Sequence, residues 1–219
     1  MDVFFTKEVT LIERDILQSI SKNEAPPPIS LLLPISLKGS IAIFDRWHSD
    51  VWTACTRACI SLPAGSCARM LHDGASALRY LHLSGWCHCD ITPSNILCNS
   101  SFSSFCVCDL GAAVAHGGMV QQYSPRFCGP CAASSGVADP RDDMISLALS
   151  VVACATLSKP KWTHSHPPTE TCRAVRILGG RIVFFCSRRG ACSFPWPPIA
   201  WTRSQELVFA KRLNRMGIC

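Results

Sequence analysis

The stretch from Trp86 to Gly111, WCHCDITPSNILCNSSFSSFCVCDLG, decides the fold of this chain. It contains Asp90, an asparagine five residues later at Asn95, and a second aspartate, Asp109, that opens Asp-Leu-Gly directly after an apolar run. Phosphoryl transfer uses one carboxylate to accept the proton of an attacking hydroxyl, and a carboxamide with a second carboxylate to hold magnesium ions. The order and spacing of these residues indicate that chemistry.

Strongly apolar helices are predicted on both sides of this stretch. Residues 66–83 place apolar side chains on one continuous face, and Gly85 is a natural helix stop. The segment from Ile145 to Leu157 is apolar on nearly all sides, which is typical of a buried helix. Between these helices, residues 96–98 and 105–108 are predicted to form short strands that bracket the loop.

The N-terminal part of the chain predicts a helix, a hairpin and a second, shorter helix. Apolar residues recur at helical spacing from Thr6 to Ile20, and a proline-rich segment at 21–30 ends that helix. Ile29–Ile35 and Ile41–Phe44 are predicted strands around a turn at Lys38-Gly39-Ser40. The residues that follow the second strand, from Asp50 to Ile60, can form the short helix.

Together these segments resemble the protein kinases. His88-Cys89-Asp90-Ile91-Thr92-Pro93-Ser94-Asn95 is similar to the catalytic loop H-R-D-L-x-x-x-N, and Asp109-Leu110-Gly111 is similar to D-F-G. Tyr80–Gly85 resembles the Y-L-H-x-x-G that precedes the loop, and Asp143–Ala148 resembles the D-x-W-S-L-G that opens helix F. The resemblance implies an α+β fold with a mostly helical C-lobe and a truncated N-lobe of helix C plus two strands.

The partial kinase domain implied by the resemblance covers residues 1–157. Residues 158–219 match none of the remaining kinase helices and are unassigned, with a composition typical of a diverged or poorly ordered tail. Within them, Arg181–Cys186 is a strand-like run and Ser204–Leu213 is a helix-like run.

The resemblance also implies catalytic roles. Asp90 would be the catalytic base, and Asn95 and Asp109 would hold Mg²⁺. Glu13 would be the helix C glutamate, because Leu17 lies one turn later, where helix C has its apolar contact to the Asp-x-Gly segment. The second choice for that glutamate is Glu8, followed by Ile12.

The implied nucleotide is ATP. By resemblance, residues 45–48 form the hinge between the lobes, Phe44 and Trp47 contact the nucleotide there, and Leu97 lies under the adenine ring. Asp143 would accept hydrogen bonds from the backbone of the catalytic loop.

Within the family, the run D-I-T-P-S-N-I-L looks like the herpesvirus-encoded serine/threonine kinases, which accept Ser or Thr at the position of Thr92. Pro93 argues against the tyrosine-kinase form of the loop. The subfamily implies serine and threonine hydroxyls of proteins as substrates, and a location in the host nucleus and the virion.

Departures from the family pattern affect the expected activity. No G-x-G-x-x-G loop and no V-A-I-K lysine precede Glu13, so this glutamate is expected to lack a partner and catalysis to be impaired. Cys89 replaces the arginine of H-R-D, so activation by a loop phosphate paired with that arginine is not expected. Gly129-Pro130-Cys131 occupies the A-P-E position without its glutamate. The alternative to an active kinase is a pseudokinase or kinase fragment that acts as a binding scaffold.

The amino-acid composition excludes some classes of binding partner and location. The formal charge of +6 arises from 21 basic and 15 acidic residues without a run of like charges, so nucleic-acid binding is not expected. The sequence has 15 cysteines but no secretory leader at its start, which favours reduced thiols in an intracellular protein. The longest apolar run, Met144–Leu157, is too short to cross a bilayer of roughly 30 Å as a helix.

The cysteines suggest two alternative functions, a redox pair and a zinc site. Cys128-Gly129-Pro130-Cys131 has the spacing of a redox C-x-x-C, but the strand before it and the amphipathic helix after it are missing from the pattern. A zinc site could draw on several cysteines and a histidine, although the Cys-x-Cys spacings fit buried strand residues better. The possible zinc ligands are Cys87, His88, Cys89, Cys106, Cys108, Cys128 and Cys131.

Overall fold

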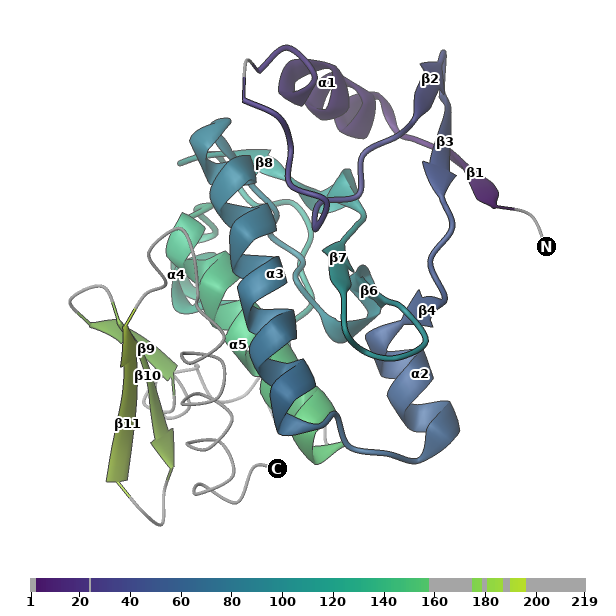
Figure 1. The fold of residues 1–219 in the computed structure, drawn as a ribbon. Coiled ribbons are helices and arrows are strands. Elements are labelled where there is room, and N and C mark those ends of the chain that lie inside the picture. The colour runs from purple at the N-terminus through teal and green to yellow at the C-terminus, as the bar shows by residue number, and fades with distance from the viewer. Residues whose placement is uncertain (1–2, 24, 158–174, 179–180, 187–189, 196–219) are drawn as a thin grey trace.

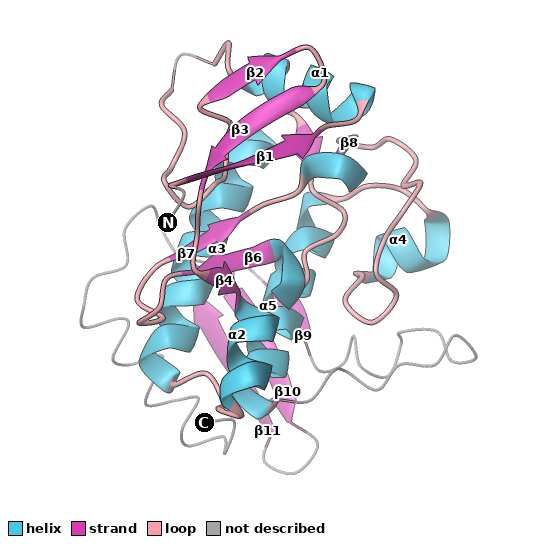
Figure 2. Cartoon of the chain, turned by 90° about the vertical axis from the view of Figure 1, so that its right-hand side faces the viewer, coloured by secondary structure: helices cyan, strands magenta, loops and turns pink. Residues whose placement is uncertain are grey.

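The computed structural model describes residues 3–23, 25–157, 175–178, 181–186 and 190–195. The fold is α+β, as predicted. A small sheet with one helix lies at one end of the molecule, and the long helices lie at the other end, with short strands between them (Figures 1 and 2). In the part of the chain that the structure describes, no helix has the length and apolar character needed to cross a membrane.

The sheet at the N-terminal end is antiparallel, with the strand order β1-β3-β2. β1 spans Phe4–Glu8, β2 spans Ser36–Lys38 and β3 spans Ile41–Asp45. Gly39 turns between β2 and β3 with φ of 61°, a left-handed conformation that glycine adopts without a Cβ penalty. The predicted hairpin turn is therefore confirmed.

The N-terminal helix is shorter than the sequence predicts. α1 spans Leu11–Ile20, and the Thr10 hydroxyl caps it by accepting the backbone N–H of Glu13 at 3.1 Å. Residues 4–8, which include part of the predicted helix, instead pair with β3 as the strand β1. The expected helix from Thr6 is thus wrong at its start, because pairing with a strand distant in sequence outweighs the helical apolar spacing.

The predicted strand at Ile29–Ile35 is also wrong. This segment is a loop that contacts β7 (Phe105–Val107). Leu31 forms an isolated bridge to Val107, and the N–H of Leu32 donates to the Val107 carbonyl at 2.8 Å. Pro34 lacks the N–H that a paired strand would use, and β2 begins only after it, at Ser36.

The remaining part of the kinase-like region is mostly helical, and its short strands surround the quoted loop (Figure 2). The predicted helices at 50–60 and 66–83 and the predicted strands at 96–98 and 105–108 are confirmed within a few residues. The elements are α2 (Val51–Ala58), α3 (Ala64–Leu83), α4 (Pro130–Ser135), α5 (Pro140–Thr156), β4 (Ser49–Asp50), β5 (Trp86–Cys87), β6 (Ile96–Cys98), β7 (Phe105–Val107), β8 (Val114–Ala115), and the 3₁₀ turns η1 (Pro93–Asn95) and η2 (Leu110–Ala112).

α5 is the buried helix predicted from its apolar sequence. Nearly every residue from Asp142 to Ala155 is buried, and α5 packs along α3. At the crossing, Gly74 of α3 has no side chain, and a Cβ there would lie 2.6 Å from Cδ1 of Leu147. The two helices therefore approach closely, and α5 supports the loop from below.

A separate antiparallel sheet follows later in the chain. β9 (Val175–Leu178), β10 (Arg181–Cys186) and β11 (Gly190–Pro195) pair in the order β11-β10-β9. The predicted strand at 181–186 is confirmed, and the predicted helix at 204–213 lies outside the described residues.

Candidate active site

The backbone of the loop is fixed by one buried carboxylate. Asp143, in the first turn of α5, accepts the N–H groups of His88 at 2.7 Å and Cys89 at 2.8 Å. Its carboxylate also bonds Nε2 of His82 at 2.8 Å, from the C-terminal turn of α3. These bonds offset the cost of burying the carboxylate. The bond predicted between Asp143 and the loop backbone is present.

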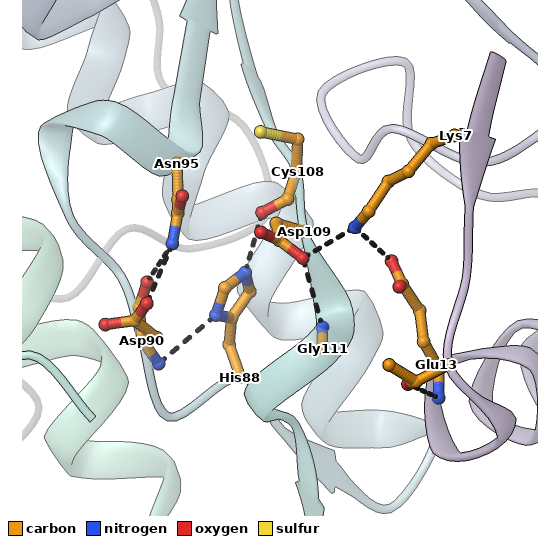
Figure 3. Close-up of polar contacts among 9 residues, drawn as sticks. Lys7, Glu13, His88, Asp90, Asn95, Cys108, Asp109 and Gly111 are labelled. Carbon is orange, nitrogen blue, oxygen red and sulfur yellow. Dashed lines mark hydrogen bonds and ion pairs between the residues drawn. The ribbon is translucent and has the colours of Figure 1, made fainter. Parts of the chain in front are cut away.

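His88 connects the loop to the strand that precedes Asp109. Its ring is fully buried, and Nδ1 accepts the N–H of Asp90 at 3.3 Å. Nε2 must then carry the hydrogen, and it donates to the carbonyl of Cys108 at 3.1 Å. The imidazole therefore has a structural role, and it sets the separation between Asp90 and Asp109 (Figure 3).

Asp90 and Asn95 form a pair across the loop. Nδ2 of Asn95 donates to the backbone carbonyl of Asp90 at 2.9 Å and to its Oδ2 at 3.0 Å. Oδ1 of Asp90 is buried and has no hydrogen-bond partner among the described residues. Because an orphaned buried acceptor is costly, this oxygen is suited to accept a hydrogen bond from a substrate.

Asp109 has an unusual backbone conformation. It follows β7 with φ of 67° and ψ of 85°, a region that non-glycine residues seldom adopt and that costs of order 1–3 kcal/mol. Its Oδ1 accepts the N–H of Gly111 at 3.3 Å and the ammonium of Lys7 at 2.8 Å. Burial alone would raise the pKa of this carboxyl, but the bonds from Lys7 outweigh it and lower the pKa below its ordinary value.

Glu13 has a partner, contrary to the prediction. Nζ of Lys7, on β1, lies 2.9 Å from Oε1 of Glu13 on α1, and the glutamate side chain is only 4 % exposed (Figure 3). Burial alone would lower the pKa of the Lys7 ammonium, but its bonds to Asp109 and Glu13 raise it above the ordinary value. Lys7 on β1 is thus the partner that Glu13 was expected to lack. Glu8, the second choice for the glutamate, is exposed on β1.

The sequence contains one signal that Lys7 lies outside the helix. Thr10 and Glu13 have the T-x-x-E spacing of a capping box at the start of a helix, which places Lys7 before the helix. The continuing helical spacing of Val9 and Ile16 concealed this boundary.

The apolar contact predicted between helix and loop is present. Leu17 of α1 and Leu110 of the Asp-Leu-Gly segment belong to one buried cluster, and α1 contacts η2. This cluster holds Glu13 and Asp109 at distances that Lys7 can bridge.

The residues assigned to the nucleotide lie on separate elements. Phe44 is buried in the same cluster as Leu110, and its ring stacks on Phe5 with centroids 5.2 Å apart. Trp47 is half-buried in the segment after β3, and Leu97 is half-buried on β6, where it pairs with Cys106. Their contact with a nucleotide stays a prediction.

The cysteines near the site do not have the character of reactive thiols. Burial, with the nearby carboxylate of Asp143, raises the pKa of the Cys89 thiol to about 12. Burial also raises the pKa of Cys131, whereas a redox C-x-x-C relies on a lowered one. Within the described ranges, no group of three or more His, Cys, Asp or Glu side chains is arranged to hold a metal ion.

A fold of this class, with a loop aspartate paired to an asparagine and a strand lysine paired to a helix glutamate, is that of the phosphoryl-transferring kinases. The sequence model of the protein kinase domain matches residues 16–182, more than half of the chain. The chain therefore belongs to the protein kinase family. No curated protein matches it with significant similarity.

Proposed function

We propose that this chain transfers the γ-phosphoryl group of ATP to serine or threonine hydroxyls of proteins. The observation that carries the proposal is the position of Lys7, whose ammonium bonds both Glu13 and Asp109. In kinases a lysine so paired binds the nucleotide phosphates, and the aspartate of the Asp-x-Gly segment binds magnesium. The chain therefore has these groups already gathered at one place.

The residues fit magnesium and an acceptor hydroxyl. Asn95 uses its amide nitrogen on Asp90, which leaves its amide oxygen for a cation, and Asp109 supplies a carboxylate. Such oxygen donors are the ligands Mg²⁺ prefers. When bound, ATP would supply the phosphoryl group and Mg²⁺ would neutralise its charge. Oδ1 of Asp90 would accept the proton of the attacking hydroxyl.

The serine/threonine preference is proposed from the form of the loop. Thr92 is buried, its carbonyl accepts the N–H of Asn95 at 3.0 Å, and Pro93 begins the 3₁₀ turn that carries Asn95. This compact turn brings the carboxamide back to Asp90 without a lysine in the loop. The herpesvirus-like form of the loop also supports proposing the host nucleus and the virion as locations.

Nucleotide binding and phosphoryl transfer test the proposal separately. We expect Mg²⁺ and ATP to raise the melting temperature, and radiolabelled phosphate to appear on a serine- and threonine-rich protein such as casein. Asp90→Asn should lower kcat by roughly 10²–10⁴-fold while binding is kept. Asp45→Asn, at an exposed position on β3, is the matched control.

The outcomes separate the alternatives. Binding without transfer in the wild type would favour the pseudokinase scaffold. Absence of a thermal shift at millimolar ATP and Mg²⁺ would contradict the proposed nucleotide site itself. Equal activity of Asp90→Asn and Asp45→Asn would remove Asp90 from the role of base.

A further inference from the structure

The segment around Gly129 lies against the first turn of α5. The chain has no glutamate at the A-P-E position, where the family anchors this segment. Instead, Oδ2 of Asp142 accepts the backbone N–H of Ala132 at 2.6 Å. Asp142 is 6 % exposed, so this is a buried bond between a carboxylate and the segment. Bonds of this kind are stronger than those between neutral groups.

The packing around Asp142 is fitted to its carboxylate. A Cβ at Gly129 would lie 2.3 Å from both Cγ and Oδ1 of Asp142, so only glycine fits there while the aspartate is present. The other carboxylate oxygen, Oδ1, is buried without a hydrogen-bond partner among the described residues. Burial raises the pKa of this carboxyl, while the N–H groups of Ala132 and Cys131 favour its charged form. The contact therefore places a carboxylate in a buried position, which is costly unless its oxygens are hydrogen-bonded.

Neighbouring residues of α5 hold different parts of the site. Asp143 bonds the backbone of His88 and Cys89 beside the proposed base, and Asp142 bonds the segment at Ala132. Cys89, Gly129 and both aspartates line one small pocket, so the loop and the segment meet at this turn. A shift of the segment relative to α5 would therefore be a shift relative to the catalytic loop.

We propose that Asp142 is a positioning residue that anchors the segment 129–132 to α5, in place of the glutamate that the chain lacks. The anchor would fix the surface on which a protein substrate lies next to Asp90. This role in catalysis rests on the proposed kinase function, whereas the anchoring contact does not.

Substitutions at both sides of the contact test the anchor. Asp142→Ala removes the acceptor, and Asp142→Asn keeps one acceptor oxygen without the charge. Gly129→Ala introduces the clash, and the double variant Gly129→Ala/Asp142→Ala makes room for the new methyl group. Arg141→Ala, in the same turn but exposed and paired with Asp139, is the control.

The first readout is amide hydrogen exchange at Ala132. We expect exchange to accelerate by roughly tenfold or more in Asp142→Ala, and by less in Asp142→Asn, because a bond to a charged acceptor is lost or weakened. Gly129→Ala should accelerate exchange when Asp142 is present and have little further effect when residue 142 is alanine. Exchange in Asp142→Ala equal to that in Arg141→Ala would overturn the anchor, with circular dichroism showing that each variant is folded.

The second readout compares KM for the protein substrate with KM for ATP. We expect Asp142→Ala to raise KM for the protein substrate by roughly tenfold with KM for ATP unchanged, and Asp142→Asn to restore part of the loss. Equal changes in both constants would show a general loss of structure and overturn the positioning role. If the wild type transfers no phosphate, the proposed function fails, and hydrogen exchange alone still decides whether Asp142 anchors the segment.

Discussion

Replacing Lys7 by methionine should separate the N-terminal strand from the helix and loop that it joins. The change removes the ammonium but keeps a side chain of similar length. Glu13 then loses the cation 2.9 Å from its Oε1, and Asp109 loses the cation 2.8 Å from its Oδ1. These two ion pairs connect β1 to α1 and to the Asp-Leu-Gly segment.

The two pairs differ in their expected contributions because they differ in exposure. The side chains of Lys7 and Asp109 are 35 % and 48 % exposed, so this pair should contribute no more than a surface pair, about 0.2–1 kcal/mol. The Glu13 side chain is 4 % exposed, and removal of its cation leaves a buried charge. That loss costs about 3–5 kcal/mol for a fully buried pair. Since Lys7 itself is partly exposed, we expect a total loss of about 2 kcal/mol in the free energy of unfolding.

Thermal denaturation measures this loss. For a chain of this size, about 2 kcal/mol corresponds to a decrease of about 4–8 °C in Tm. Glu13→Gln should relieve much of the cost, because the amide is neutral and does not need a buried cation. A double-mutant cycle between Lys7→Met and Glu13→Gln should therefore give a coupling of about 1–2 kcal/mol.

Exposed residues of the same sheet provide the controls. Lys38→Met and Glu8→Gln change the same side-chain types on β2 and β1 without a buried partner, and should change Tm by less than about 1–2 °C. A Tm of Lys7→Met equal to the Tm of these controls would contradict the expected contribution of the two ion pairs. An effect of Lys7→Met that simply adds to that of Glu13→Gln would contradict it as well.

Gly74→Ala should lower the free energy of unfolding by about 1–3 kcal/mol in a denaturant titration, because the new methyl group would clash with Leu147. An unchanged free energy of unfolding would show that α3 and α5 can move apart without cost. Burial raises the folded-state pKa of Asp142 above 3.8, so the native state binds this proton more tightly than the unfolded chain. Wild-type stability should therefore fall relative to Asp142→Asn as pH rises from about 4 towards neutrality, and a difference independent of pH would contradict this. With a pKa of about 12, the Cys89 thiol should react much more slowly with iodoacetamide at pH 8 than exposed Cys59, as peptide mass spectrometry can measure, and comparable rates would show that the loop opens.

The sequence was sufficient for the parts of the fold that depend on local patterns. The helix around Leu78 has an apolar face at helical spacing, and the buried helix that contains Asp143 is apolar on nearly all sides. Gly39 marks its turn through its backbone freedom. The contact of Asp143 with the catalytic loop followed from the family resemblance and is present.

The sequence was insufficient where distant segments decide the structure. Lys7 was hidden because apolar spacing continues from the helix into β1, and only pairing with β3 makes that segment a strand. The role of Asp142 was missed because an aspartate near a helix N-terminus is ordinary, and its bond to Ala132 depends on how the segment folds back.

The carboxylate of Asp143 has a practical consequence for the design of shorter fragments. It bonds groups from the end of α3 and from the catalytic loop, although Asp143 itself lies on α5. A fragment can therefore contain every residue of the loop and still lack the carboxylate that holds the loop backbone. Peptides or truncated proteins that stop before α5 would leave the N–H groups of His88 and Cys89 without their acceptor. A fragment that keeps this backbone support must therefore include α3, the catalytic loop and α5.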